Sequence, residues 1–166
     1  MRVLFLCTEN AARSQIAEAL LRDMSKGTME VVSAGSRPAT HVHPLAREAI
    51  RKMLGHDVCD LHPKPLERFV GQSFDYVITV CDASAESCPV FPGDPEQIHW
   101  SFDNPVAARG DALSQEHAFH KVAGEIAARL RIWLSLPRQR EHIDRTLEAT
   151  SLPAPAARTE AAAGRR

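Results

Sequence analysis

Short apolar runs and longer amphipathic stretches alternate along this chain. The short runs are typical of strands buried in a parallel sheet, and we expect four of them, at residues 3–6, 29–32, 74–80 and 98–100. In the longer stretches apolar side chains recur three and four positions apart, which predicts helices at residues 16–24, 44–54 and 114–134. This order of elements predicts an α/β fold: a single domain with a four-stranded parallel sheet flanked by helices on both faces.

The apolar pattern fades after residue 136. Residues 152–157 and 161–166 are dominated by Ala, Pro, Gly and Arg and contain almost nothing to bury. We therefore predict one domain over residues 1–136 and a flexible C-terminal tail over residues 137–166. This tail is expected to be disordered apart from a frayed helix around residues 140–147.

The composition places the chain in a broad class. It has 166 residues, of which 44% are apolar and 25% charged, and a formal net charge of −1. No basic excess points to a nucleic-acid partner, and the first apolar run is too short for a signal peptide or a membrane span. We therefore expect a soluble cytoplasmic monomer. In that compartment the four cysteines are more often catalytic, redox-active, metal-binding or buried than joined in structural disulfides.

Two of the cysteines follow predicted strands directly. Cys7 comes after the first strand and Cys81 after the third. Right-handed crossovers bring the carboxyl ends of parallel strands to one edge of the sheet, where ligands bind. We therefore expect both thiols at this edge.

The segment from Cys7 to Ser14 has the features of an oxyanion-binding loop. A cysteine, five residues, an arginine and a serine lie between a strand and a helix, where backbone N–H groups and the helix dipole favour a bound anion. Arg13 adds a planar, two-pronged donor. The same field, with a hydrogen bond from Ser14, is expected to lower the pKa of the Cys7 thiol. The residues expected around the anion are Thr8, Glu9, Asn10, Ala11, Ala12 and Arg13.

Residues 1–136 resemble the low-molecular-weight tyrosine phosphatase fold, in the branch of the thioredoxin-coupled arsenate reductases. The segments that carry the resemblance are residues 7–14 with Gln15, Ala17 and Glu18, then residues 33–35, 81–89 and 99–105. The resemblance implies arsenate as the substrate, with phosphate or sulfate as competing anions. It also implies no bound cofactor and thioredoxin as the electron donor.

A relay of three cysteines is the mechanism that this resemblance implies. Cys7 forms a covalent adduct with arsenate, Cys81 attacks Cys7 and releases arsenite, and Cys88 attacks Cys81 to leave a disulfide for thioredoxin. A phosphatase needs only the loop and a proton donor, so the two later cysteines indicate the reductase branch. The alternatives are two ordinary buried cysteines or a zinc site, although the seven-residue spacing does not favour zinc.

The proton donor departs from the family pattern. The family normally has an aspartate before a proline, but here Asn104 precedes Pro105. An amide cannot act as a general acid. We therefore expect Asp103, one residue earlier, to take this role.

The family's cation site is altered as well. The site uses an asparagine, a glutamate, a serine and an aspartate, and Asn10, Glu18 and Ser33 match the first three. A gap-free count places Lys64 at the aspartate position. We expect a network without a metal, because the lysine ammonium can supply the charge itself; a solvated surface lysine is the alternative.

Two other functions stay open. One is a tyrosine-type phosphatase, a hydrolase; aromatic entrances suit phosphotyrosine, but the single tyrosine, Tyr76, lies inside a predicted strand. The other is a non-enzymatic sensor whose thiols respond to oxidants or metalloids.

Overall fold

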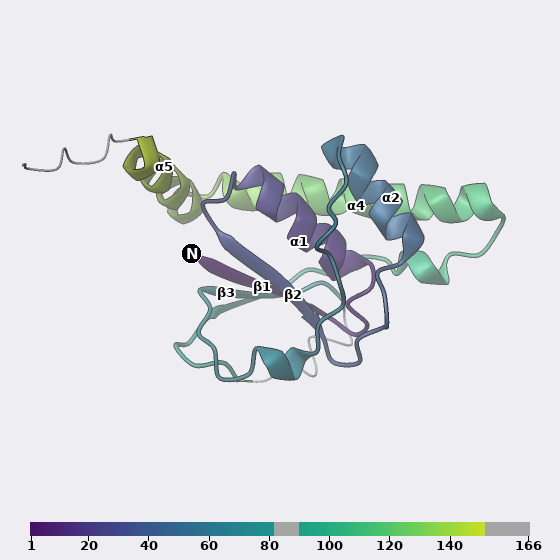
Figure 1. Ribbon diagram of the computed structural model, residues 1–166, viewed down its shortest axis with the longest axis horizontal. Helices are drawn as coiled ribbons and strands as arrows, with labels where there is room; N and C mark the ends of the chain where they lie inside the picture. The colour runs from purple at the N-terminus through teal and green to yellow at the C-terminus, as the bar shows by residue number, and fades with distance from the viewer. Residues whose placement is uncertain (82–89, 152–166) are drawn as a thin grey trace, which may run out of the picture.

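The computed structural model describes residues 1–81 and 90–151 (Figure 1). Its centre is one sheet of parallel strands in the order β2-β1-β3-β4. The strands are β1 (Arg2–Cys7), β2 (Glu30–Gly35), β3 (Tyr76–Thr79) and β4 (Glu96–His99). Their positions confirm the four-stranded parallel sheet and the α/β fold class.

The two faces of the sheet are covered differently. Helices α1 (Arg13–Met24), α2 (Pro44–Leu54) and α4 (Ala112–Leu134) lie together on one face (Figure 1). On the other face the described chain contributes the short 3-10 helix η1 (Leu66–Arg68) and the segments around it. Within these described ranges, no helix combines the length and apolar character needed to cross a bilayer.

The alternation of side chains along β1 divides the core into two clusters. Val3 and Phe5 pack with the residues of α1, α2 and α4, whereas Leu4 and Leu6 pack on the opposite face. Successive side chains of a strand point to opposite faces, and all four are at most 2% exposed. Cys7 continues the series of Val3 and Phe5, so its thiol faces the helical layer where α1 begins.

The chain continues beyond α4 as a further helix. Residues 137–151, which the sequence predicts to be disordered apart from a frayed helix around residues 140–147, form α5 (Pro137–Ser151), so the expected disorder is corrected over this range. Gln139 is 2% exposed and donates a hydrogen bond to the Tyr76 hydroxyl at 2.7 Å. The Arg138 guanidinium lies 5.1 Å from the centre of the same ring. The rest of the predicted tail lies outside the described residues.

Removal of the Gln139 side chain tests how α5 is docked. Gln139→Ala is expected to lower the free energy of unfolding by about 1–2 kcal/mol, because a buried hydrogen bond to Tyr76 is lost. Arg140→Ala, at the exposed neighbouring position, is the matched control and should change it by less than about 0.5 kcal/mol. Urea unfolding followed by tryptophan fluorescence measures both. Equal effects of the two substitutions would contradict docking through Gln139.

Candidate active site

The carboxyl ends of β1 and β3 meet at a pocket of about 350 Å³. Cys7 ends β1 and Cys81 follows β3, and both are buried thiols in the pocket wall. The Thr8 hydroxyl lies 3.7 Å from the Cys81 sulfur, so the loop after β1 contacts the end of β3. The structure therefore brings the two cysteines to one edge of the sheet. The pocket is lined by Cys7, Thr8, Glu9, Ala11, Ala12, Arg13, Cys81, Asn104 and Val106.

The backbone of the loop is held from outside by the segment 36–43. The Arg37 N–H donates to the Thr8 carbonyl and the Ala39 N–H to the Glu9 carbonyl, both at 2.8 Å. Because these carbonyls are bonded outward, the loop turns N–H groups toward the sulfur, with the Asn10 N–H 3.1 Å from Cys7 Sγ. Converging N–H groups are suited to an oxyanion.

Gly35, at the end of β2, makes this loop conformation possible. A Cβ atom at position 35 would lie 2.7 Å from the Thr8 carbonyl oxygen and 3.0 Å from the Asn10 Cβ. Asn10 itself has a positive φ of 49°, which asparagine adopts more readily than most residues. The close approach of β2 thus fixes the path of the loop.

Arg13 and the start of α1 supply the positive end of the pocket. Arg13 is the first residue of the helix, and its Nη1 donates to the Phe102 carbonyl at 3.0 Å, which aims the guanidinium along the pocket wall. Ala12, at the N-cap, has no side chain that could cap the helix. The first-turn N–H groups and the helix dipole therefore favour an anion here.

Burial raises the pKa of the Cys7 thiol above its usual value. The hydrogen bonds from Ser14, whose hydroxyl lies 2.8 Å from the sulfur, and from the Asn10 N–H lower it, and Cys81 adds a smaller rise. The net direction is upward, which corrects the expectation of a lowered pKa, because desolvation at the strand end exceeds the effect of the donors. The hydrogen bonds from Ser14 and Asn10 are therefore what stabilises a thiolate at Cys7 against the effect of burial.

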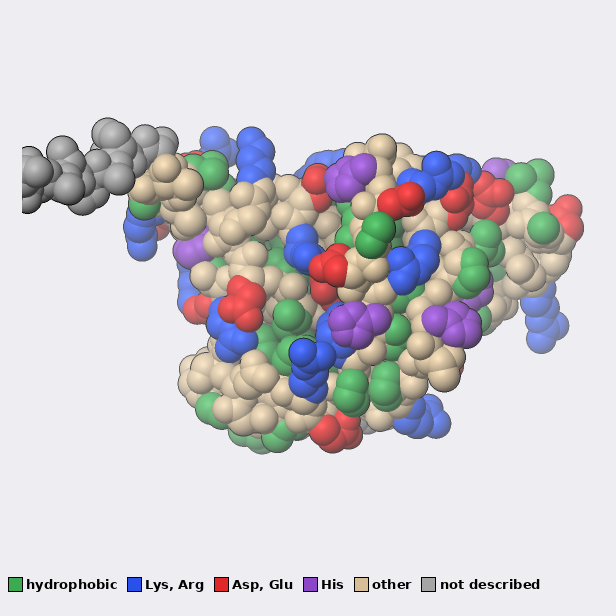
Figure 2. Space-filling view, viewed as in Figure 1, with side chains coloured by type: hydrophobic (Ala, Val, Ile, Leu, Met, Phe, Trp, Pro, Cys, Tyr) green, Lys and Arg blue, Asp and Glu red, His purple; other side chains and the backbone are tan. Residues whose placement is uncertain are grey.

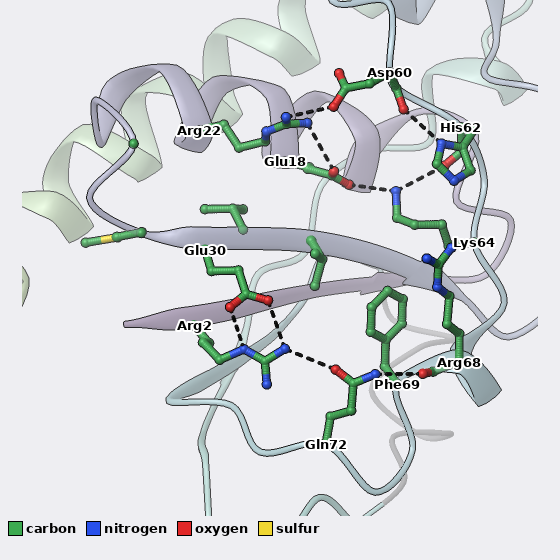
Figure 3. A pocket seen from close by; sticks show the side chains of 14 residues that line it. Arg2, Glu18, Arg22, Glu30, Asp60, His62, Lys64, Arg68, Phe69 and Gln72 are labelled. Atoms are coloured by element: carbon green, nitrogen blue, oxygen red, sulfur yellow. Dashed lines mark hydrogen bonds and ion pairs between the residues drawn. The ribbon is translucent and has the colours of Figure 1, made fainter.

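The four residues of the expected cation network lie together behind the loop. Lys64 Nζ is 3.0 Å from Glu18 Oε2, and the two side chains are 7% and 6% exposed. The Ser33 hydroxyl donates to the same oxygen at 2.5 Å. Asn10 Nδ2 donates to Ser33 at 2.7 Å and to Ser14 at 2.8 Å. In Figure 3, Lys64 and Glu18 point toward each other, so an ammonium group occupies this network.

The structure does not bring Asp103 into the pocket. Its carboxylate is 80% exposed and lies 3.2 Å from the Lys121 ammonium on α4. Asn104 does line the pocket, but its side-chain oxygen accepts a hydrogen bond from the backbone at the start of η2 (Pro105–Ala107). Cys88, the third cysteine of the expected relay, lies outside the described residues.

Gln15 stands in the family motif but was not among the residues expected at the site. It is fully buried, and its Nε2 donates to both Asn10 oxygens and to the His62 carbonyl. In the part of the chain that the structure describes, Gln15 Oε1 is the one buried side-chain polar atom without a hydrogen bond. The sequence does contain one sign of this role: a polar residue, Gln15, stands directly before Ile16 in a helix whose first two turns are buried.

A cysteine in the wall of a pocket, with a backbone N–H at its sulfur and an arginine at the helix start, is an arrangement suited to an oxyanion. The sequence profile described as "Low molecular weight phosphotyrosine protein phosphatase" matches residues 2–148. The chain belongs to this family, as its motifs indicate. The matched range extends well into α5.

Arsenate reductases are among the similar proteins. The chain is 33% identical over 129 residues to the arsenate reductase of Halalkalibacterium halodurans, which covers 78% of this chain and 91% of that protein. The structure of arsenate reductase from Archaeoglobus fulgidus has a TM-score of 0.63 and 30% identity, covering 81% of this chain and 99% of that one. The thioredoxin-dependent arsenate reductase of Corynebacterium glutamicum has a TM-score of 0.60 and 33% identity, covering 87% of this chain and 62% of that one.

Potassium is expected to have no effect on this site, because the Lys64 ammonium already neutralises Glu18. Exchange of sodium for potassium should leave the melting temperature and the rate of Cys7 alkylation unchanged. Lys64→Asp, which places a second carboxylate beside Glu18, is the control in which potassium should raise the melting temperature. A several-fold potassium stimulation of the unsubstituted protein would contradict the expectation.

Proposed function

We propose that this protein reduces arsenate to arsenite with Cys7 as the nucleophile. The observation that carries the proposal is a second buried thiol, Cys81, in the same pocket as Cys7 and Arg13. Hydrolysis of a phosphate ester needs one nucleophile, whereas reduction of arsenic takes two electrons, which two thiols supply when they form a disulfide. The similarity to arsenate reductases supports the choice of substrate.

In the first step arsenate lies against the loop N–H groups and the Arg13 guanidinium, where phosphate or sulfate would compete. The Cys7 sulfur attacks arsenic, a sulfur–arsenic bond forms, and one arsenate oxygen leaves as water. The departing oxygen is an arsenate hydroxyl, which takes up the proton of the Cys7 thiol as it leaves. Arsenic is not yet reduced.

In the second step the Cys81 sulfur attacks the Cys7 sulfur. A Cys7–Cys81 disulfide forms and the sulfur–arsenic bond breaks. Its electron pair stays on arsenic, the Cys81 thiol proton passes to an arsenic-bound oxygen, and the product leaves as arsenite. The contact between Thr8 and Cys81 supports this step, since it places the second thiol beside the loop that carries the first.

Regeneration of the thiols needs an external reductant. We assign the third position of the relay to Cys88, which attacks Cys81 and leaves a Cys81–Cys88 disulfide for thioredoxin to reduce. The likeness to the thioredoxin-dependent reductase of Corynebacterium glutamicum supports this donor. The chemistry requires a reducing compartment, which favours the cytoplasm.

A phosphatase would use the same pocket, but the position of Asp103, the expected acid, disfavours it. Ester hydrolysis needs an acid to protonate the leaving alcohol. Asp103 faces Lys121, and the residue that lines the pocket is the amide Asn104. A thiol sensor remains the alternative if the protein shows no turnover.

Arsenate-dependent oxidation of NADPH, with thioredoxin and thioredoxin reductase, tests the proposal. Cys7→Ser and Cys81→Ser are expected to lower turnover at least about a hundredfold, because each removes a sulfur that forms a bond. Cys59→Ser is the matched control, since Cys59 is exposed and lines a different cavity. Full arsenate turnover in Cys81→Ser would contradict the relay. Hydrolysis of an aryl phosphate that survives loss of Cys81 would favour a phosphatase.

Asp103 is the predicted site residue that the geometry supports least. As a general acid its carboxylate would have to leave Lys121 and turn into the pocket. We expect Asp103→Asn to leave arsenate turnover within about twofold, as for other exposed ion pairs. A tenfold or larger fall in kcat, with loss of one limb of the pH profile, would restore Asp103 to the role of proton donor.

A further inference from the structure

An unbroken series of hydrogen bonds connects a buried ion pair with the nucleophilic sulfur. It begins at Lys64 and Glu18, beside a cavity of about 600 Å³ along β2 (Figure 3), and it ends in the active-site pocket. Every distance in the series lies between 2.5 and 3.0 Å. In order, the series runs through Lys64, Glu18, Ser33, Asn10, Ser14 and Cys7.

The direction of the first hydrogen bond is set by charge. An ionised carboxylate accepts hydrogen bonds and donates none. With the Lys64 ammonium 3.0 Å from Glu18 Oε2, the Ser33 hydroxyl must give its only proton to that oxygen. Ser33 can then only accept from its next neighbour, Asn10.

The orientation of the Asn10 amide agrees with this direction. Its Oδ1 accepts from the Lys64 N–H at 2.8 Å and from Gln15 Nε2 at 2.9 Å, which leaves Nδ2 on the side of the serines. The two protons of Nδ2 are therefore given to Ser33 and to Ser14. If the amide were flipped, its NH2 group would face the Lys64 N–H, and two donors cannot hydrogen-bond to each other.

The last hydrogen bond then has one available direction. Ser14 Oγ receives a proton from Asn10, so its own proton is free to point at Cys7 Sγ, 2.8 Å away. A hydroxyl that donates to sulfur stabilises the thiolate, and one that accepts from it stabilises the thiol. The order of donors thus favours the reactive form of Cys7.

We propose that Lys64 is a positioning residue for the nucleophile: its ammonium pairs with the buried Glu18 carboxylate, and this ion pair fixes the direction of every hydrogen bond up to Ser14 and Cys7. The inference rests on the proposed function in one respect, that Cys7 is the nucleophile. Without the ammonium, the buried carboxylate has lost its closest cation, so it either repels a thiolate at Cys7 or no longer fixes the order of donors. Both outcomes disfavour the thiolate.

Other ionisable groups of the described structure lie near both ends of the series. Arg22 Nη1 lies 3.6 Å from the second Glu18 oxygen, Oε1, and also pairs with Asp60. Lys64 Nζ donates to the His62 carbonyl at 3.1 Å. The remaining ionisable side chains of the two cavities are Arg2, Glu30, His62 and Arg68 beside Lys64, and Glu9, Arg13 and Cys81 beside Cys7.

The test is the pH dependence of iodoacetamide alkylation at Cys7, in a protein whose other cysteines are serine. Lys64→Met is expected to slow alkylation at neutral pH about tenfold and to move the midpoint about one pH unit upward, as for loss of one hydrogen bond to a charged group. Lys64→Arg should keep the rate within about threefold, because the adjacent cavity accommodates a guanidinium. Alkylation does not involve arsenate, so its outcome is independent of the proposed reduction.

Two further variants separate positioning from a loss of stability. Arg22→Gln is the matched control: it removes a cation that contacts Glu18 outside the series, and alkylation should change less than about twofold. In a Ser14→Ala background the series no longer reaches the sulfur, so Lys64→Met should add less than about twofold. Rates are compared per folded molecule, from thermal unfolding of each variant.

The proposal is overturned if Lys64→Met melts earlier while the pH profile of Cys7 stays in place. It is also overturned if Lys64→Met slows alkylation equally in the presence and absence of the Ser14 hydroxyl, since the effect of Lys64 would then not depend on the hydrogen bond from Ser14 to Cys7. Normal alkylation profiles in a protein without arsenate turnover would instead count against the proposed function.

Discussion

The side-chain amide of Asn10 connects the anion loop to the structure behind it. It donates to Ser14 and Ser33 and accepts from the Lys64 N–H and from Gln15. These contacts need two donors at one end of a side chain and an acceptor at the other, which neither a hydroxyl nor a carboxylate offers. Because Asn10 also holds a positive φ, the placement of the Cys7 sulfur depends on this one amide.

Much of the fold could be predicted because its elements follow simple periods. Apolar side chains mark the strands and the helices that cover them, and parallel topology alone places Cys7 and Cys81 at one edge. The loop at residues 7–14 could be recognised in the sequence, because a cysteine, an arginine and a serine at this spacing suit the binding of an oxyanion. The pairing of Lys64 with Glu18 required the family's cation site, since nothing local joins positions so far apart in sequence.

The features that could not be predicted depend on tertiary surroundings. Helix α5 is docked by Gln139 and Arg138 on Tyr76, with Ile143 as an apolar contact, so its sequence shows too few apolar residues to mark it as a packed helix. Burial raises the pKa of the Cys7 thiol, and the spacing of residues in the sequence does not show how deeply a side chain is buried. The direction of Asp103 is decided by Lys121, a residue on a helix that begins well after it.

The burial of both sulfur atoms limits which molecules can reach them. Cys7 and Cys81 are 5% and 4% exposed, at the base of a pocket of about 350 Å³. A small oxyanion or an alkylating reagent can enter such a space, whereas the surface of a folded protein cannot reach its floor. The proposed relay suits this constraint, because it moves the oxidising equivalents away from the pocket before a macromolecular reductant acts on them.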